Sequence, residues 1–161
     1  MITYRSPNKE DATSIYNTAK ASTLDLNSTY SYLMMASLFS DTCLVAEENN
    51  EIVGFVTGFI PVKRTDTFPS SFFVWQIAVR KNYRGRGIAY SMIDYLIKKI
   101  KLPYLEAHVT KPNKASMNTF NKLAREYNTS IKTSMGFHET DFPVDGKDSE
   151  LLLTIGPFDW K

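Results

Sequence analysis

The chain has very little cysteine and histidine, which argues against a fold held by disulfides and against a metal site. Among its 161 residues it has one cysteine, Cys43, and two histidines, His108 and His138. One cysteine forms no disulfide within the chain, and two histidines so far apart, without neighbouring ligands, make a poor metal site. Because no histidine lies near Cys43 in the sequence, we expect it to be a buried small hydrophobe and not a nucleophile. We therefore predict metal-free chemistry.

Other absences narrow the class of protein. No apolar run approaches the roughly 18 residues that a membrane span needs, and MITYRSPNKED, residues 1–11, has neither a signal-peptide core nor a transit-peptide composition. The formal net charge is +2 and the charges are interspersed, so no basic tract indicates nucleic-acid binding. The length of 161 residues suits one domain. We predict a single cytoplasmic domain, residues 1–161, with no membrane or nucleic-acid partner.

The spacing of apolar residues predicts an α/β fold. Residues 72–79 are apolar apart from Gln76, which is typical of a strand covered on both faces. From Ile88 to Ile100 the apolar residues fall on a helical stripe. The remaining pattern predicts strands at 2–5, 42–46, 52–61 and 103–110, a polar hairpin turn at 47–51, and helices within 6–22, at 29–39 and at 114–127. This order predicts a sheet with mixed strand directions.

Between that strand and that helix lies RGRGIA, residues 84–89, a turn suited to phosphate. Gly85 and Gly87 have no Cβ, so the chain can bend sharply and a ligand can approach the backbone. The first amides of the following helix have no partner within it and point outward with the positive end of the helix dipole. Arg84 and Arg86 add positive charge. The alternative is a solvated helix cap between two basic residues.

Arg84, Gly87 and Ala89 fit the pattern [Q/R]xxGx[G/A], which here follows a strand and precedes a helix. It resembles the acetyl-CoA signature of the GCN5-related N-acetyltransferase superfamily. The resemblance implies a mixed, mostly antiparallel central sheet flanked by helices. It also implies that residues 84–89 bind the pyrophosphate of acetyl-CoA, and that Ile77 and Val79 pair with its pantetheine arm.

Asn113 and Ser116 resemble the second cofactor motif of this superfamily, in which the asparagine and its helix frame the CoA arm. Many members carry a tyrosine on this helix as general acid, but Phe120 stands at that place here. Phe120 cannot donate a proton, although the resemblance still places it beside the cofactor. We predict Tyr32 as the substitute donor, with Tyr30 a second candidate; the alternative is that both are helix-surface aromatics. Gly136 and Phe137 match the usual GF of the closing strands.

Two longer motifs, LDLNSTYSY at 24–32 and FVWQ at 73–76, resemble the L-2,4-diaminobutyrate acetyltransferases, which make the precursor of the osmolyte ectoine. The resemblance implies that L-2,4-diaminobutyrate is the substrate, acetylated on its side-chain (N4) amine, and that the protein is a homodimer. It implies that Asp25 and Glu150 bind the substrate ammonium groups, and an indole such as that of Trp75 can hold a cation. The alternatives are a helix cap for Asp25, core packing for Trp75 and a solvent-facing strand entry for Glu150.

The chemistry itself requires a base, because an amine attacks a thioester only when it is neutral. Glu106 is the predicted base, acting directly or through water, in direct attack within a ternary complex; the alternative is an edge-strand carboxylate in solvent. Two other functions stay open at this point. One is acetylation of another small amine, such as a polyamine. The other is a non-catalytic CoA-binding module, for which the missing hydroxyl at Phe120 is the only hint.

Overall fold

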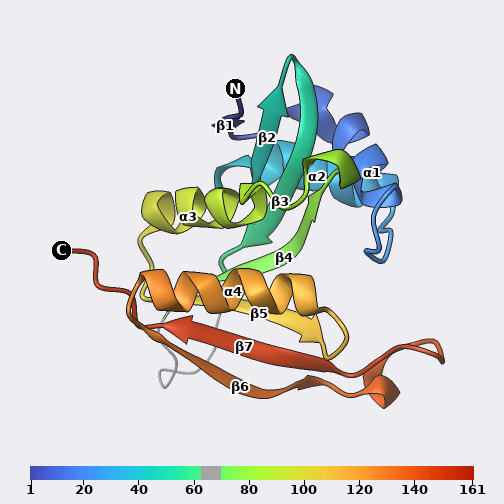
Figure 1. Cartoon of the computed structure of the whole chain (residues 1–161). Helices are drawn as coiled ribbons and strands as arrows, with labels where there is room; N and C mark the ends of the chain where they lie inside the picture. The colour runs from blue at the N-terminus through green and yellow to red at the C-terminus, as the bar shows by residue number, and fades with distance from the viewer. Residues whose placement is uncertain (63–69) are drawn as a thin grey trace. The chain divides into compact units, whose positions relative to one another are not determined.

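The computed structural model describes residues 1–62 and 70–161, which form both strands and helices (Figure 1). Their bounds are β1 (Thr3–Arg5), α1 (Ala12–Lys20), α2 (Thr29–Leu38), β2 (Leu44–Glu48), β3 (Glu51–Phe59), β4 (Ser71–Val79), α3 (Ile88–Ile100), β5 (Tyr104–Thr110), α4 (Lys114–Glu126), β6 (Ser130–Phe137) and β7 (Glu150–Gly156). The strand order is β1-β2-β3-β4-β5-β7-β6. The predicted mixed, mostly antiparallel sheet flanked by helices is confirmed.

The hairpin of β2 and β3 is tighter than predicted. Its turn consists of Asn49 and Asn50 alone, with φ angles of 53° and 63°, and Glu48 pairs with Glu51 across it. A two-residue turn with positive φ at both central residues matches the twist of the flanking strands, and asparagine tolerates this conformation. The glutamates that we assigned to the turn therefore belong to the strands.

The chain divides into two compact units, which we describe one at a time. In the first unit, residues 1–60 and 74–100, helices α1 and α2 pack on one face of the strands and α3 on the other. Phe55 of β3 meets the ring of Tyr32 from α2 at a centroid distance of 6.4 Å. On the opposite face, a Cβ added at Gly54 would lie 3.2 Å from Cε of Met92 in α3. Glycine at this position lets α3 lie close to the sheet.

In the second unit, residues 61–73 and 101–161, β5 and β6 both pair antiparallel with β7. Helix α4 packs against β6 and β7, and its Phe120 and Leu123 are fully buried. The C-terminal residues hold the start of β5, because the Trp160 indole donates to the Leu102 carbonyl at 2.8 Å. The described part of this unit outside β4 is therefore the sheet of β5, β7 and β6, covered by α4 and closed by a short C-terminal segment.

β4 differs from the prediction in how it is covered. Its even-numbered residues 72, 74, 76 and 78 are buried, whereas the odd-numbered residues 73–79 are half-buried or exposed. The expectation of a strand covered on both faces was wrong, because an apolar run does not reveal whether both of its faces are packed. The strand therefore has a packed face and an accessible face.

Two expectations about the interior and the surface can be compared with the structure. Cys43 is 1% exposed, and burial raises the pKa of its thiol to about 11, so it is the buried hydrophobe that we predicted.

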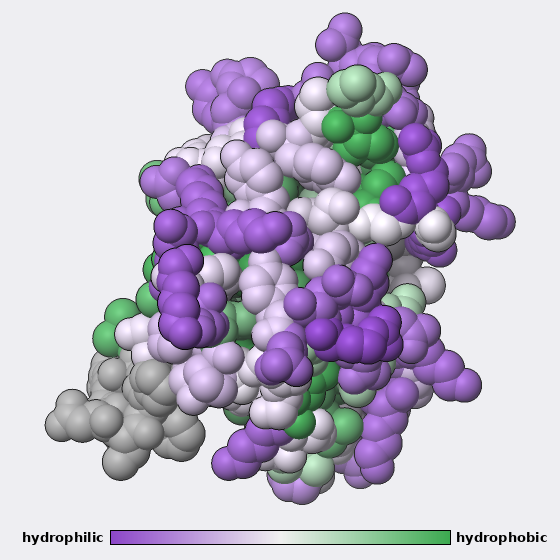
Figure 2. All heavy atoms as spheres, turned by 60° about the vertical axis from the view of Figure 1, so that its left-hand side comes forward, coloured by the Kyte–Doolittle hydropathy of each residue, from purple (hydrophilic) through white to green (hydrophobic). Residues whose placement is uncertain are grey.

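Figure 2 shows hydrophilic residues over most of one face of the molecule, with smaller apolar areas between them. Among the described residues, no helix combines the length and the apolar character needed to cross a membrane.

Candidate active site

The predicted phosphate turn lies between β4 and α3 in the first unit, and residues 84–87 are exposed. Gly85 and Gly87 both have φ of 75°, a conformation that costs an L-residue about 1–2 kcal/mol. A Cβ built on either glycine would meet nothing within 4 Å. The glycines are therefore needed for the backbone conformation, and the space beside them is open to a ligand.

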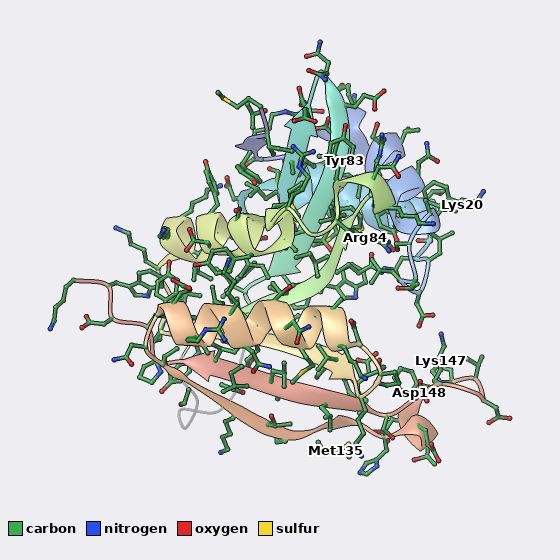
Figure 3. All side chains as sticks on the ribbon, viewed as in Figure 1. Lys20, Tyr83, Arg84, Met135, Lys147 and Asp148 are labelled. Atoms are coloured by element: carbon green, nitrogen blue, oxygen red, sulfur yellow. The ribbon has the colours of Figure 1, made fainter. Side chains whose placement is uncertain are left out.

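The two arginines of the turn have different partners. Arg84, labelled with Tyr83 in Figure 3, donates from Nε to the Val79 carbonyl at 3.0 Å. Arg86 lies over the Tyr83 ring at 5.2 Å and donates to Glu48 Oε1 at 3.3 Å. The guanidinium of Arg86 lowers the pKa of the Glu48 carboxyl. The turn is therefore positively charged, but one carboxylate offsets part of that charge.

The accessible face of β4 carries three of the predicted site residues. Ile77 and Val79, predicted to pair with pantetheine, are half-buried there. Trp75 shares this face and is 41% exposed, so the alternative that its indole packs in the core is wrong. The prediction assigned all three to ligand contacts, and their facing leaves them accessible for that role.

Asp25 is exposed, in the segment between α1 and α2. It does not cap α2, because Ser28 accepts the hydrogen bond from the Ser31 amide, at 3.2 Å. The helix-cap alternative for Asp25 is therefore wrong. Its carbonyl oxygen accepts a hydrogen bond from the Gln76 side chain at 2.8 Å, which ties this segment to β4.

The two tyrosine candidates differ in exposure. Tyr30 is 67% exposed and is a helix-surface aromatic, as one alternative held. Tyr32 is only 2% exposed, so that alternative is wrong for it. Its hydroxyl donates to Gln76 Oε1 at 3.1 Å, which makes it a poor match for the predicted role of proton donor.

Glu106 lies in the second unit and is 6% exposed. β5 is not an edge strand, since it has β4 and β7 as neighbours in the strand order, and Glu106 stands opposite Thr154 of β7. Its Oε2 accepts a hydrogen bond of 2.7 Å from Ser71 Oγ, which is itself 1% exposed. The alternative of an edge-strand carboxylate in solvent is therefore wrong. A buried carboxylate that is held in place by a hydrogen bond is a suitable arrangement for a general base.

His108 follows Glu106 by two residues on β5, so both side chains face the same side of the strand. Its ring meets Phe73 and Phe137 edge-on, with centroids 5.2 and 4.7 Å away. Its Nδ1 lies 3.6 Å from Glu150 Oε2. Burial lowers the pKa of His108, and the carboxylates of Glu150 and Glu106 oppose this effect only in part. At neutral pH the imidazole is therefore uncharged.

Gly136 completes this arrangement, since a Cβ there would lie 2.7 Å from Cδ2 of His108 and 2.8 Å from the Glu150 carbonyl oxygen. Only glycine lets β6 pass this close to the imidazole. Glu150 is the first residue of β7 and its side chain is 29% exposed. It contacts His108 and still reaches solvent, so it is accessible to a cationic ligand.

The second cofactor motif has a structural role as well. The side chain of Asn113 accepts from the Ser116 amide at 3.1 Å and caps α4. Phe120 is 0% exposed, so no surface of it is available to a ligand in this structure. Asn113 and Ser116 as cofactor contacts stay predictions, and the exposure of Phe120 does not favour that role.

Three residues that the sequence analysis left without a role now have one. Gln76 links Tyr32 to the Asp25 segment, Ser71 holds Glu106, and His108 contacts Glu150. Gln76 did carry a signal, because it is the only polar residue in the apolar run 72–79. Ser71 carried none, since its partner lies 35 residues away.

Within residues 1–62 and 70–161, no group of His, Cys, Asp and Glu is placed to hold a metal ion.

The lowered pKa of His108 predicts a pH-dependent stability. An unfolded histidine binds a proton below about pH 6.5, whereas folded His108 resists protonation. Between about pH 7.5 and pH 5.5 the unfolded state therefore gains more protons, and the free energy of unfolding falls. We expect His108→Gln to reduce this fall, as measured by urea unfolding at both pH values. His138→Gln, at an exposed position, is the control, and an identical pH dependence in wild type and His108→Gln would contradict the assignment.

The chain is similar over nearly its whole length to known acetyltransferases. It is 43% identical over 160 residues to L-2,4-diaminobutyric acid acetyltransferase of Shouchella clausii, covering 98% of this chain and 88% of the relative. It is 45% identical over 159 residues to the protein of the same name from Halalkalibacterium halodurans, covering 97% and 82%.

A solved structure shares the fold as well as the sequence. Diaminobutyrate acetyltransferase from Paenibacillus lautus, in complex with L-2,4-diaminobutyric acid and coenzyme A, superposes with a TM-score of 0.89 at 32% identity, covering 100% of this chain and 98% of that one. The model of the acetyltransferase (GNAT) family matches residues 11–124. The chain therefore belongs to the GNAT family of acetyltransferases.

Proposed function

We propose that the protein transfers the acetyl group of acetyl-CoA to the N4 amine of L-2,4-diaminobutyrate, the step that supplies the precursor of ectoine. The observation that carries the proposal is the likeness, over the full chain, to the Paenibacillus lautus enzyme that was solved with this substrate and coenzyme A. Relatives with 43% and 45% identity bear the same activity in their names. The choice of the N4 amine rests on the resemblance.

In this proposal, the turn at residues 84–89 binds the pyrophosphate. The open space beside Gly85 and Gly87 lets the phosphates reach the amides at the start of α3, and the helix dipole favours an anion there. Arg84 and Arg86 supply the opposite charge. The half-buried residues Ile77 and Val79 contact the pantetheine arm, and Asn113 and Ser116 at the start of α4 also contact the cofactor.

The diamino acid brings two ammonium groups and one carboxylate, so its site needs anions. Asp25 and Glu150 are the proposed anions, and both reach solvent. Because His108 is neutral at physiological pH, the charge of Glu150 stays available to a cation. The exposed indole of Trp75 offers a π face to the same kind of group.

Glu106 is the proposed general base, acting directly or through water. The carboxylate is buried and accepts a hydrogen bond from Ser71, so a proton from the attacking amine can be accepted there without competition from bulk water. The amine then attacks the thioester directly in a ternary complex, and the enzyme contributes mainly by holding the two reactants together. Phe120 cannot protonate the departing thiolate.

The same proposal treats residues 1–161 as one acetyltransferase domain, because the family match at 11–124 runs through both compact units. It places the enzyme in the cytoplasm, in keeping with an acetyl-CoA-dependent biosynthetic role.

We also propose a homodimer. Helix α2 is apolar on most sides, and exposed apolar side chains gather on and beside it, namely Leu26, Tyr30, Leu33, Leu38 and Phe39. A patch of this kind on a protein surface favours association.

The activity is tested by incubating acetyl-CoA with L-2,4-diaminobutyrate, ornithine, lysine and putrescine in parallel, and measuring thiol release. We expect the highest kcat/KM for diaminobutyrate, with the acetyl group located on N4 by NMR. A preference for putrescine would instead indicate a polyamine acetyltransferase. Binding of CoA without thiol release from any amine would indicate a non-catalytic module.

The phosphate turn is tested by Gly87→Ala. The substitution strains a backbone with φ of 75° and places a methyl group where phosphate would approach, so we expect the Kd for CoA to rise at least about tenfold. Gly146→Ala is a matched control, because Gly146 has φ of 83° and equally open space but lies outside the turn. Equal CoA affinity in the two variants would refute the assignment.

The dimer is tested by Leu38→Arg, which places a charge on the α2 patch at a side chain that is 74% exposed. We expect light scattering to give twice the chain mass for the wild type and the mass of one chain for the variant, because a buried unpaired charge disrupts an interface. Val144→Arg, at a position 60% exposed outside the patch, should stay dimeric. A dimeric Leu38→Arg variant would exclude this surface.

A further inference from the structure

The packed face of β4 carries one polar side chain, Gln76, which is 7% exposed. A buried carboxamide is costly unless it is hydrogen-bonded, and the two ends of this one are satisfied by different parts of the first unit. We propose that Gln76 and Tyr32 are positioning residues that hold the backbone of residues 25–27, and thereby place the Asp25 carboxylate for the substrate ammonium. This inference rests on the proposed function of Asp25.

Three hydrogen bonds form a closed path around this segment. Gln76 Nε2 donates to the Asp25 carbonyl at 2.8 Å, and Gln76 Oε1 accepts from the Tyr32 hydroxyl at 3.1 Å. The same hydroxyl accepts from the Asn27 amide at 3.3 Å. The carbonyl of Asp25 and the amide of Asn27 are thus held by two side chains that also hold each other.

The donors and acceptors of this path admit one arrangement. The Asp25 carbonyl can only accept and the Asn27 amide can only donate, so the carboxamide nitrogen faces Asp25 and the tyrosine oxygen receives the Asn27 proton. The single hydroxyl proton of Tyr32 is then directed at Gln76 Oε1. Neither side chain can be replaced by an apolar one without leaving a buried polar group unpaired.

The holding side chains are themselves fixed by packing, whereas Asp25 and Leu26, which follow the core-packed Leu24, lie at the surface. The Tyr32 ring meets Tyr16 and Phe55 edge-on, with centroids 5.8 and 6.4 Å away. Residues 21–28 form neither helix nor strand, and Asp25 and Leu26 are exposed. The hydrogen bonds from these core side chains therefore order a surface segment before a ligand binds. They reduce the conformational entropy that the segment loses on binding.

This role differs from proton donation, which the sequence analysis predicted for Tyr32. Tyr32 is 2% exposed, and the proton of its hydroxyl is donated in the hydrogen bond to Gln76. A donor to a departing thiolate must reach the reacting atoms. A positioning residue must only keep Asp25 in place.

The test compares Tyr32→Phe and Gln76→Met with the wild type. Both variants keep the volume of the side chain and remove hydrogen bonds to the segment. We expect KM for L-2,4-diaminobutyrate to rise about tenfold in each, with kcat and the KM for acetyl-CoA within about twofold. Because both substitutions break one path, the double variant should resemble the single ones. Tyr16→Phe, which alters a ring beside Tyr32 but no member of the path, is the control.

A second readout does not depend on activity. Hydrogen exchange of the Leu26 and Asn27 amides should become faster in Tyr32→Phe and Gln76→Met than in Tyr16→Phe, while exchange in β4 and α3 stays slow. Faster exchange throughout the unit would show general loosening and would overturn the proposal. If one variant does not fold, the other still gives both readouts.

The outcomes separate this inference from the proposed function. A wild type that does not acetylate diaminobutyrate refutes the proposed function, and the exchange data alone then decide whether the segment is held. An active wild type whose variants have unchanged KM and unchanged exchange refutes the positioning role. A fall in kcat of about 100-fold or more, with altered pH dependence and unchanged KM, would instead make Tyr32 a catalytic acid.

Discussion

The alternation of β4 is the constraint on which most of the candidate site depends. One face of Ser71–Val79 is packed and the other is accessible, so a shift of one residue in its register would exchange the two sets of side chains. The packed face supplies Gln76 to the Asp25 segment. The accessible face presents Trp75, Ile77 and Val79, and Ser71, which donates to Glu106, has the same odd-numbered facing. The alternation of one strand thus separates the side chain that holds the substrate segment from those proposed to contact ligands.

The two glutamates of the candidate site, Glu106 and Glu150, differ in their surroundings. Glu106 is buried and accepts a hydrogen bond from Ser71, whereas Glu150 lies beside a neutral imidazole and reaches solvent. A buried carboxylate suits proton transfer, and an accessible one suits binding of a cation. The two glutamates lie in the same unit, but their surroundings suit them to different tasks.

Much of the fold could be predicted from the sequence because it follows from short-range patterns. The strand before RGRGIA and the helix from Ile88 depend on residues close together in the chain. The motif itself is also local, so its glycines and arginines could be singled out. Burial on one face or both was not predictable for β4, because the partners of its two faces come from other parts of the sequence.

The site residues that were missed depend on contacts over long sequence separations. Ser71 and Glu106 are 35 residues apart, and Tyr32 and Gln76 are 44 apart. Nothing in either local sequence indicates the partner. Tyr32 was assigned to proton donation because the residue type allows it, and only its burial and its hydrogen bonds reveal a different environment.

The pair formed by Arg86 and Glu48 has a consequence for which anions the turn can hold. The Glu48 carboxylate is part of the same chain, so it competes with any anion for Arg86 at a high effective concentration. A monovalent ion such as chloride offers little to displace it, whereas a pyrophosphate brings several charges and also reaches the amides of the helix. The Glu48 carboxylate therefore neutralises part of the charge of the turn, and the proposed phosphate site would favour polyvalent anions over monovalent ones.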